Sequence, residues 1–164
     1  MTQTDLSLTQ SEELLRFFKR YLSFYTELLE LERRKLSDIL NNQLSSLDQH
    51  VKAEEACTLR ARGLEQEKEA LLRENGLEEF TFRKILPLVH PLKRQELTNL
   101  HQDLSELLLD LKAVNYRCNH LTQLKLRQIY AQMDRLEASS ANRRPYSALA
   151  QQKNDTTGLL FKRI

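Results

Sequence analysis

The stretch LTNLHQDLSELLLDLKAVNYRCNHL, residues 97–121, places an apolar side chain at every third or fourth position without a gap. These positions are Leu97, Leu100, Leu104, Leu107, Leu111, Val114, Cys118 and Leu121. The spacing follows the 3.6-residue turn of an α-helix, so it predicts a helix with one apolar face. Pro91 suits the first turn, where a missing N–H costs nothing. We therefore predict a helix over residues 91–137 whose apolar face belongs to the core between residues 97 and 121.

The apolar pattern changes register after residue 121. Two consecutive steps of four lead from Cys118 through Thr122 to Leu126, and such a pair of steps marks a register change. A second series follows, namely Leu126, Ile129, Met133 and Leu136. The first half of the helix is expected to pack on the two preceding helices, which leaves the second half free for another partner. From the pattern alone, this second series fits a partner-binding face and an ordinary core face equally well.

Another helix is expected over residues 9–40. It opens with Thr9-Gln-Ser-Glu12, which has the Ser/Thr-x-x-Glu form of a capping box. Apolar residues follow at alternating steps of three and four, with Glu32 as the single interruption. They are Leu15, Phe18, Leu22, Tyr25, Leu29, Leu36 and Ile39. The pattern predicts one apolar face along the whole helix.

The pair Asn41-Asn42 indicates a turn, because Asn is poor inside a helix and good at its ends. A second helix is then expected over residues 43–74, with Asn42 as its candidate cap and Gly76 as its stop. The alternative is one unbroken helix over residues 9–74, which would be about 100 Å long. The turn is the favoured interpretation. A short helical turn over residues 81–86 precedes Pro87 and Pro91.

The composition supports the same fold class. With three Gly and three Pro in 164 residues, turn signals are too few for a sandwich or barrel. We predict an all-α protein, an elongated antiparallel bundle of three long helices over residues 1–137. Residues 138–164 carry Arg143, Arg144, Lys153, Lys162 and Arg163 against Asp155, and are expected to form a flexible basic tail.

The charge pattern and the polar N-terminus argue against several partners and locations. A net charge of +2 does not indicate binding to nucleic acid. No apolar run approaches the roughly 18 residues of a membrane span, and residues 1–10 do not have the order of a secretory signal. Cys57 and Cys118 lack a partner motif and are expected to be free thiols in the cytoplasm.

No cluster typical of catalysis or metal binding occurs. Glu30 lies near Arg33 and Arg34, and Glu65 near Lys68, which predicts solvated surface pairs. No Gly-rich phosphate loop, His-Glu-x-x-His or Cys-x-x-Cys motif is present. We therefore expect no enzyme activity, no cofactor and no metal. A histidine phosphotransfer module is a weaker alternative, for which His101 and His120 are the candidates.

Several short segments, each common by itself, follow one another in an order and at a spacing that together are informative. They are Leu28–Leu36 (LLELERRKL), Leu64–Lys68 (LEQEK), Asn75-Gly76-Leu77, Thr81–Leu86 (TFRKIL), Leu111–Asn115 (LKAVN), Asn119 and Tyr146. From about residue 21 to the end, this order resembles the FlgN family of flagellar type III export chaperones. The resemblance implies a cytosolic chaperone that binds the C-terminal amphipathic helix of hook-associated proteins and delivers them to the export gate and ATPase.

The resemblance also implies roles for particular residues. The client-binding residues would be Leu121, Leu126, Ile129, Tyr130, Met133 and Leu136. Tyr146 would dock at the export gate, and Asn115 and Asn119 would be the family's Asn pair. That pair is usually three residues apart but is four apart here, and Ala150 stands where the family has Gly after the tail Tyr. The same helices also fit a structural coiled-coil or adaptor protein, including a homodimer.

Overall fold

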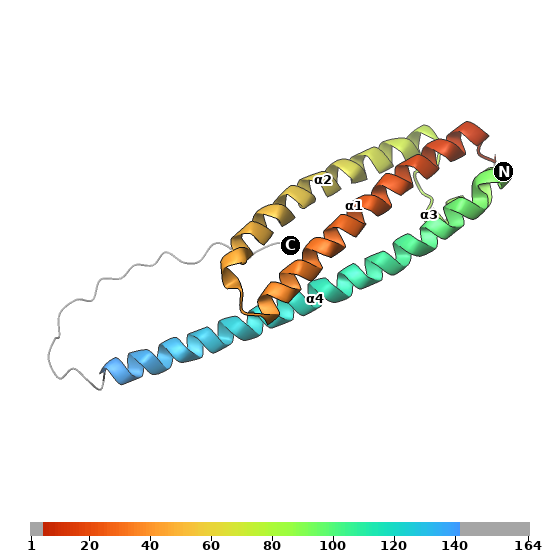
Figure 1. Cartoon of the computed structure of the whole chain (residues 1–164). Helices are drawn as coiled ribbons and strands as arrows, with labels where there is room; N and C mark the ends of the chain where they lie inside the picture. Colours follow the sequence, from red (N-terminus) through yellow and green to blue (C-terminus); the bar gives the residue numbers. More distant parts are fainter. Residues whose placement is uncertain (1–4, 142–164) are drawn as a thin grey trace. The chain divides into compact units, whose positions relative to one another are not determined.

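The computed structural model describes residues 5–141. The chain divides into two compact units, Met1–Leu124 and Lys125–Ile164. All regular elements in the described part are helical, so the predicted all-α class is confirmed. The elements are α1 Leu8–Leu40, η1 Leu44–Ser46, α2 Leu47–Glu74, α3 Phe82–Ile85, η2 Leu86–Leu88 and α4 Pro91–Ala141 (Figure 1).

The described residues contain four α-helices where the sequence predicted three long ones and a short helical turn. That turn, expected over residues 81–86, is the four-residue α3 followed by the 3₁₀ turn η2. Helix α4 ends at Ala141, four residues beyond the predicted end, so the first residues of the predicted tail are helical. The rest of that tail, including Tyr146, lies outside the described residues.

Helix α1 begins one residue before the predicted position, and its cap is a different residue. Ser7 is the N-cap: its Oγ accepts from the Gln10 N–H at 3.2 Å, and Gln10 Oε1 accepts from the Ser7 N–H at 2.9 Å. The predicted box at Thr9 and Glu12 is therefore wrong. Ser11, inside the predicted box, is buried and accepts a hydrogen bond from the His90 N–H at 3.0 Å. The sequence contains two overlapping capping-box patterns, Ser7 with Gln10 and Thr9 with Glu12. The contact of Ser11 with His90 favours the first of them.

The predicted turn between the first two long helices is confirmed. Asn41 is the C-cap of α1, and Asn42 has a φ of 55°, the left-handed conformation that Asn tolerates better than most residues. Asn42 therefore ends α1 and does not cap the next helix, which begins four residues later than predicted, at Leu47. At the other end of α2, Gly76 has a φ of 67°, as expected for a residue that stops a helix.

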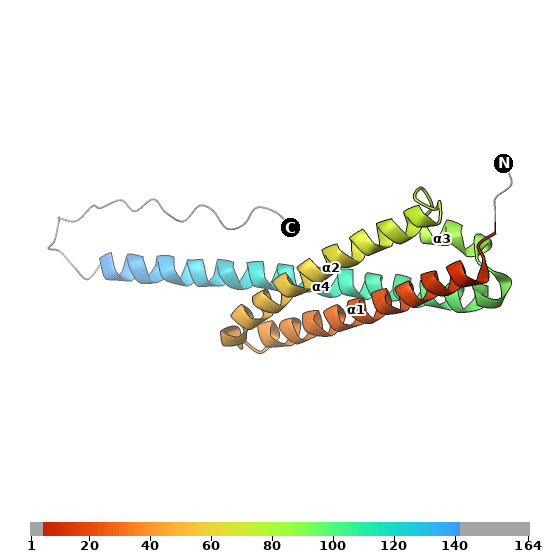
Figure 2. The same cartoon turned by 90° about the horizontal axis from the view of Figure 1, so that it is seen from above.

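The direction of the helices in the first unit follows from their ion pairs. Between α1 and α2, the paired residues run in opposite order along the two helices, namely Arg20–Glu67 and Arg60–Glu27. Between α1 and the first part of α4, they run in the same order, namely Lys19–Glu96 and Arg33–Asp110. Figures 1 and 2 show α1 and α2 side by side in both views.

The main core lies among α1, the first turns of α4 and the segment that connects α2 to α4. Its buried residues are Leu6, Leu14, Leu15, Phe17, Phe18, Tyr21, Leu77, Ile85, Leu88, Val89, Leu97, Leu100 and Leu104. Helix α2 has no fully buried residue among the described residues and covers this core with Leu64, Leu71 and Leu72. A smaller cluster of Leu36, Ile39 and Cys118 lies toward the C-terminal end of α1.

The prediction that residues 97–121 form core is confirmed for half of the apolar series. Leu97, Leu100, Leu104 and Cys118 are buried. The other four are half-buried, namely Leu107, Leu111, Val114 and Leu121. Part of this face of α4 therefore stays accessible to solvent. Both cysteines are free thiols, as predicted.

Candidate functional site

The second apolar series of α4 is exposed. We call Leu126, Ile129, Met133 and Leu136 the C-terminal stripe of α4; their exposed fractions are 41%, 42%, 49% and 68%. Their 3-4-3 spacing places them on one face of a regular helix. Large apolar side chains that share a face and remain in contact with water make the stripe a candidate surface for a partner.

The other two predicted client-binding residues have different surroundings. Tyr130 is 61% exposed and follows Ile129 directly, so it flanks the C-terminal stripe. Leu121 is half-buried and packs against the small cluster formed by Leu36, Ile39 and Cys118. Of the six predicted residues, five are exposed, and Leu121 is the one that the structure assigns in part to the core of the first unit.

The charges near the C-terminal stripe are mixed in sign. Arg127, Asp134, Arg135 and Glu137 are all exposed and interrupt the apolar series. Such a rim favours specificity in orientation more than attraction to a strongly charged partner. The apolar side chains therefore carry most of the potential for binding at this site.

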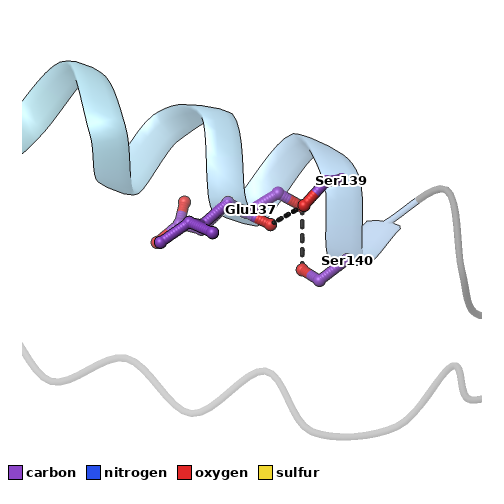
Figure 3. A pocket seen from close by; sticks show the side chains of 4 residues that line it. Glu137, Ser139 and Ser140 are labelled. Atoms are coloured by element: carbon purple, nitrogen blue, oxygen red, sulfur yellow. Dashed lines mark hydrogen bonds between the residues drawn. The ribbon is translucent and has the colours of Figure 1, made fainter.

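A shallow hollow lies near the end of α4, lined by Leu136, Glu137, Ser139 and Ser140 (Figure 3). The Ser139 hydroxyl donates to the Leu136 carbonyl oxygen and the Ser140 hydroxyl to that of Glu137, each at 2.8 Å. Both hydroxyls are thus occupied by their own helix. The hollow offers a partner the Leu136 side chain and the Glu137 carboxylate.

The predicted Asn pair lies on the exposed surface of α4 within the first unit. Asn119 Nδ2 donates to Asn115 Oδ1 at 2.9 Å. The rings of Tyr116 and His120 stack beside this pair, with centroids 6.1 Å apart and an interplanar angle of 6°. The spacing of four, which departs from the family pattern, lets the two amides bond along one helix face.

The two remaining predicted surface pairs each differ from the prediction by a partner on another helix. Glu30 pairs with Arg34 at 3.6 Å, while Arg33 reaches Asp110 of α4. Glu65 pairs with Lys68 but also accepts a hydrogen bond from the buried Tyr21 hydroxyl. Burial and this hydrogen bond raise the pKa of Tyr21. The Glu65–Lys68 pair therefore belongs to the α1–α2 interface, which spacing within α2 alone could not indicate.

One Ser-Asp-His group lies at the α1–α2 turn. Ser46 Oγ donates to Asp38 Oδ2 at 2.6 Å, and His50 Nε2 lies 2.7 Å from the same oxygen. These two contacts lower the pKa of Asp38. In Ser-His-Asp catalysis the imidazole stands between the hydroxyl and the carboxylate, whereas here the carboxylate stands between the other two. The group therefore links the end of α1 to the start of α2 and stabilises the turn between them.

The histidines named for phosphotransfer lie apart from that group. His101 is half-buried, and its ring forms a T-shaped contact with that of Phe82, with centroids 4.9 Å apart. His120 is exposed in its stack with Tyr116. No group of three His, Cys, Asp or Glu residues within residues 5–141 is arranged to hold a metal ion. In that same range, no helix combines the length and the apolar character that crossing a membrane requires.

Glu32 is the residue whose role the sequence pattern missed. It interrupts an apolar series, which was interpreted as a gap, yet its side chain is buried with an exposed fraction of 2%. Its carboxylate forms an ion pair with Lys35, also on α1, and Lys35 pairs in turn with Glu54 of α2. A charged residue on an otherwise apolar face was the available signal.

No family model, curated protein or solved structure matches this chain. The resemblance to the FlgN family therefore stays a prediction.

Proposed function

We propose that this protein is a cytosolic flagellar export chaperone whose C-terminal stripe of α4 holds the C-terminal amphipathic helix of a hook-associated protein. The observation that carries the proposal is the exposure of Leu126, Ile129, Met133 and Leu136 on one helical face. The resemblance of the sequence to the FlgN family supports the choice of client. In this proposal the three long helices form an antiparallel bundle that serves as the scaffold.

The physical basis of binding is helix-on-helix packing. An amphipathic client helix can lay its own apolar face on the stripe, in the mode by which grooves and helix faces recognise helices. Covering four partly exposed apolar side chains on each side contributes on the order of several kcal/mol, against the cost of ordering the client segment. Met133 suits this surface because its unbranched thioether adapts to different partner shapes.

The biological consequence follows from which client segment is covered. A client whose terminal helix is held on the stripe cannot use that helix to assemble. Release needs no chemical step, because competition by another partner or unfolding of the client at the export apparatus frees the helix. We extend the proposal to delivery at the export gate and its ATPase, for which the predicted docking residue is Tyr146.

The test is co-purification of the full chain with a tagged hook-associated protein that has or lacks its last helix. The double substitution Leu126→Asp with Met133→Asp places two charges on the stripe and is expected to weaken the complex at least tenfold, which corresponds to about 1.4 kcal/mol. The control is Gln128→Asp with Ala131→Asp, which adds the same charge to the same segment of α4 on the face away from the stripe. Because all four residues are exposed, both variants should keep the wild-type urea midpoint.

Two results contradict the proposal. One is an intact client that fails to co-purify, and the other is a complex that the stripe variant leaves unchanged. A homo-oligomer in light scattering that dissociates with the stripe variant and binds no client would instead support the structural coiled-coil alternative. Phosphoryl labelling lost specifically in His101→Gln or His120→Gln would support the phosphotransfer alternative.

A further inference from the structure

A charged group lies inside the first unit where α1, α2 and α4 meet. Glu32 is buried beside the small apolar cluster of Leu36, Ile39 and Cys118. The Cys118 thiol donates to the backbone carbonyl oxygen of Glu32 at 3.6 Å, which ties α4 to α1 at this point. An ionised carboxylate in such a place is costly unless it is fully paired.

The partners of Glu32 do not satisfy two ionised carboxylates. Lys35 Nζ lies 2.9 Å from Glu32 Oε2 and also pairs with Glu54, so one ammonium group serves two carboxyl groups. Glu32 Oε2 accepts no well-formed hydrogen bond from the described residues. Glu54 is half-buried and competes for the same ammonium group. Two ionised carboxylates would therefore leave one negative charge at this site without a partner, and a proton on one of them removes that charge.

Other ionisable groups lie near the pair or near its neighbours on all three helices. They are Lys35 and Asp38 on α1, His50 and Cys57 on α2, and Arg117 and Cys118 on α4. Asp38 is engaged by Ser46 and His50. With one proton on Glu32, the group of Glu32, Lys35 and Glu54 is electrically neutral. Without it, the group carries an extra negative charge that the ion pairs of Lys35 do not balance.

We propose that Glu32, Lys35 and Glu54 form a pH-sensitive latch, in which a proton on one of the two carboxyl groups keeps α4 closed against α1 at Cys118. Loss of the proton leaves a second buried negative charge and loosens this junction. The device lies entirely in the unit of residues 1–124 and is independent of the client-binding proposal.

The ionisation equilibria support the direction of the effect. Burial first, and the neighbouring Glu54 carboxyl second, raise the pKa of Glu32 to about 7 from the ordinary 4.5. Burial also opposes ionisation of Glu54, but its contacts with Glu32 and Lys35 outweigh burial and lower the pKa of Glu54. The Glu32 side chain is 3% exposed and that of Glu54 is 30% exposed, so ionisation costs more at Glu32.

The sign of the pH dependence follows. At pH values below the ordinary pKa, Glu32 is protonated in both the folded and the unfolded chain. Its ionisation then does not change the free energy of folding. As pH rises from 4.5 to 7, the unfolded chain releases the proton while the folded chain retains it, so folding loses free energy. Above the folded pKa the loss is complete. Because Gln cannot ionise, the Glu32→Gln variant should not lose folding stability over this pH range.

The first experiment measures urea unfolding of the full chain between pH 5 and pH 8 for Glu32→Gln and for Glu30→Gln. The control residue Glu30 lies on the same helix, exposed and paired with Arg34. Relative to the control, the folding equilibrium constant of Glu32→Gln should rise at least about tenfold from pH 5 to pH 8. Glu54→Gln should produce the same trend, because Glu32 then has Lys35 to itself. A ratio to the control that is equal at pH 5 and pH 8 overturns the proposal.

The second experiment separates proton binding from opening. In a Cys57→Ser background, the labelling rate of Cys118 by a thiol reagent is compared with and without Glu32→Gln at the same pH. The chain with Glu32 should label several-fold faster at pH 8 and no faster at pH 6; equal rates at pH 8 overturn the latch. Should Glu32→Gln fail to fold, a carboxyl-carbon NMR titration of the wild-type chain decides: a Glu32 midpoint above about 6 supports the proposal, and one near the ordinary value of Glu overturns it.

Discussion

Helix α4 carries two apolar series made of the same residue types, and their surroundings differ. In the first unit, Leu97 and Leu104 have exposed fractions of 0% and 6%. In the second unit, Leu126 and Leu136 are exposed to 41% and 68%. Both series follow the same three-and-four spacing. Periodicity thus identifies the apolar face of a helix, whereas the neighbouring chain decides whether that face becomes core or surface.

The largest loss of folding stability is expected for a substitution at Leu97 in the buried series. Leu97→Ala removes a fully buried side chain from the main core, which also contains residues of α1 and of the α2–α4 connection. The cavity and the lost burial should lower the free energy of unfolding by about 2–5 kcal/mol. Urea denaturation with an unchanged m-value measures this. A loss below about 1 kcal/mol would show that the first series is not the core that its burial indicates.

An intermediate effect is expected at Leu121. This side chain is half-buried and packs on the cluster of Leu36, Ile39 and Cys118, so Leu121→Ala removes only part of a core contact. The expected loss is about 1–2 kcal/mol, in proportion to the smaller buried area. The same urea measurement applies, with Leu97→Ala as the reference. A loss as large as that of Leu97→Ala would place Leu121 with the core residues and remove it from the predicted client-binding set.

The smallest effect is expected at Leu136. Its side chain is mostly in water, and Ala has a slightly better helix propensity than Leu, so Leu136→Ala should change stability by less than about 0.5 kcal/mol. Client binding should nonetheless weaken, since the stripe loses apolar area. A variant that loses more than about 1 kcal/mol of stability would indicate that the second series is already covered in the free protein, as in a homodimer.

The sequence was most informative where local chemistry decides the structure. The three long helices were found from spacing, since an apolar face must repeat with the helical turn whatever covers it. The turn at Asn41 and Asn42 and the stop at Gly76 followed from residues that tolerate the left-handed conformation. The exposed second series was anticipated through its register change, although the pattern alone left core and surface equally open.

The sequence predictions failed where a contact between residues far apart in the chain determines the local structure. The cap at Ser7 was missed because Ser11 is engaged by the backbone of His90, 79 positions away. Glu32 was interpreted as a gap, yet it is buried, and the Lys35 that pairs with it also pairs with Glu54 of another helix. Arg33 was assigned to Glu30, yet it reaches Asp110 of α4. In each case the competing local pattern was valid, and a long-range partner outweighed it.

By itself the sequence determined the helical class, the places of the long helices and the apolar series on α4, since each depends on propensity and spacing within a few turns. Tertiary structure alone decided that Leu97 is buried while Leu136 is exposed, and that Glu32 shares one ammonium group with Glu54. The physical reason is that burial and ionisation depend on which groups from elsewhere in the chain displace water. Spacing along one helix does not specify those groups.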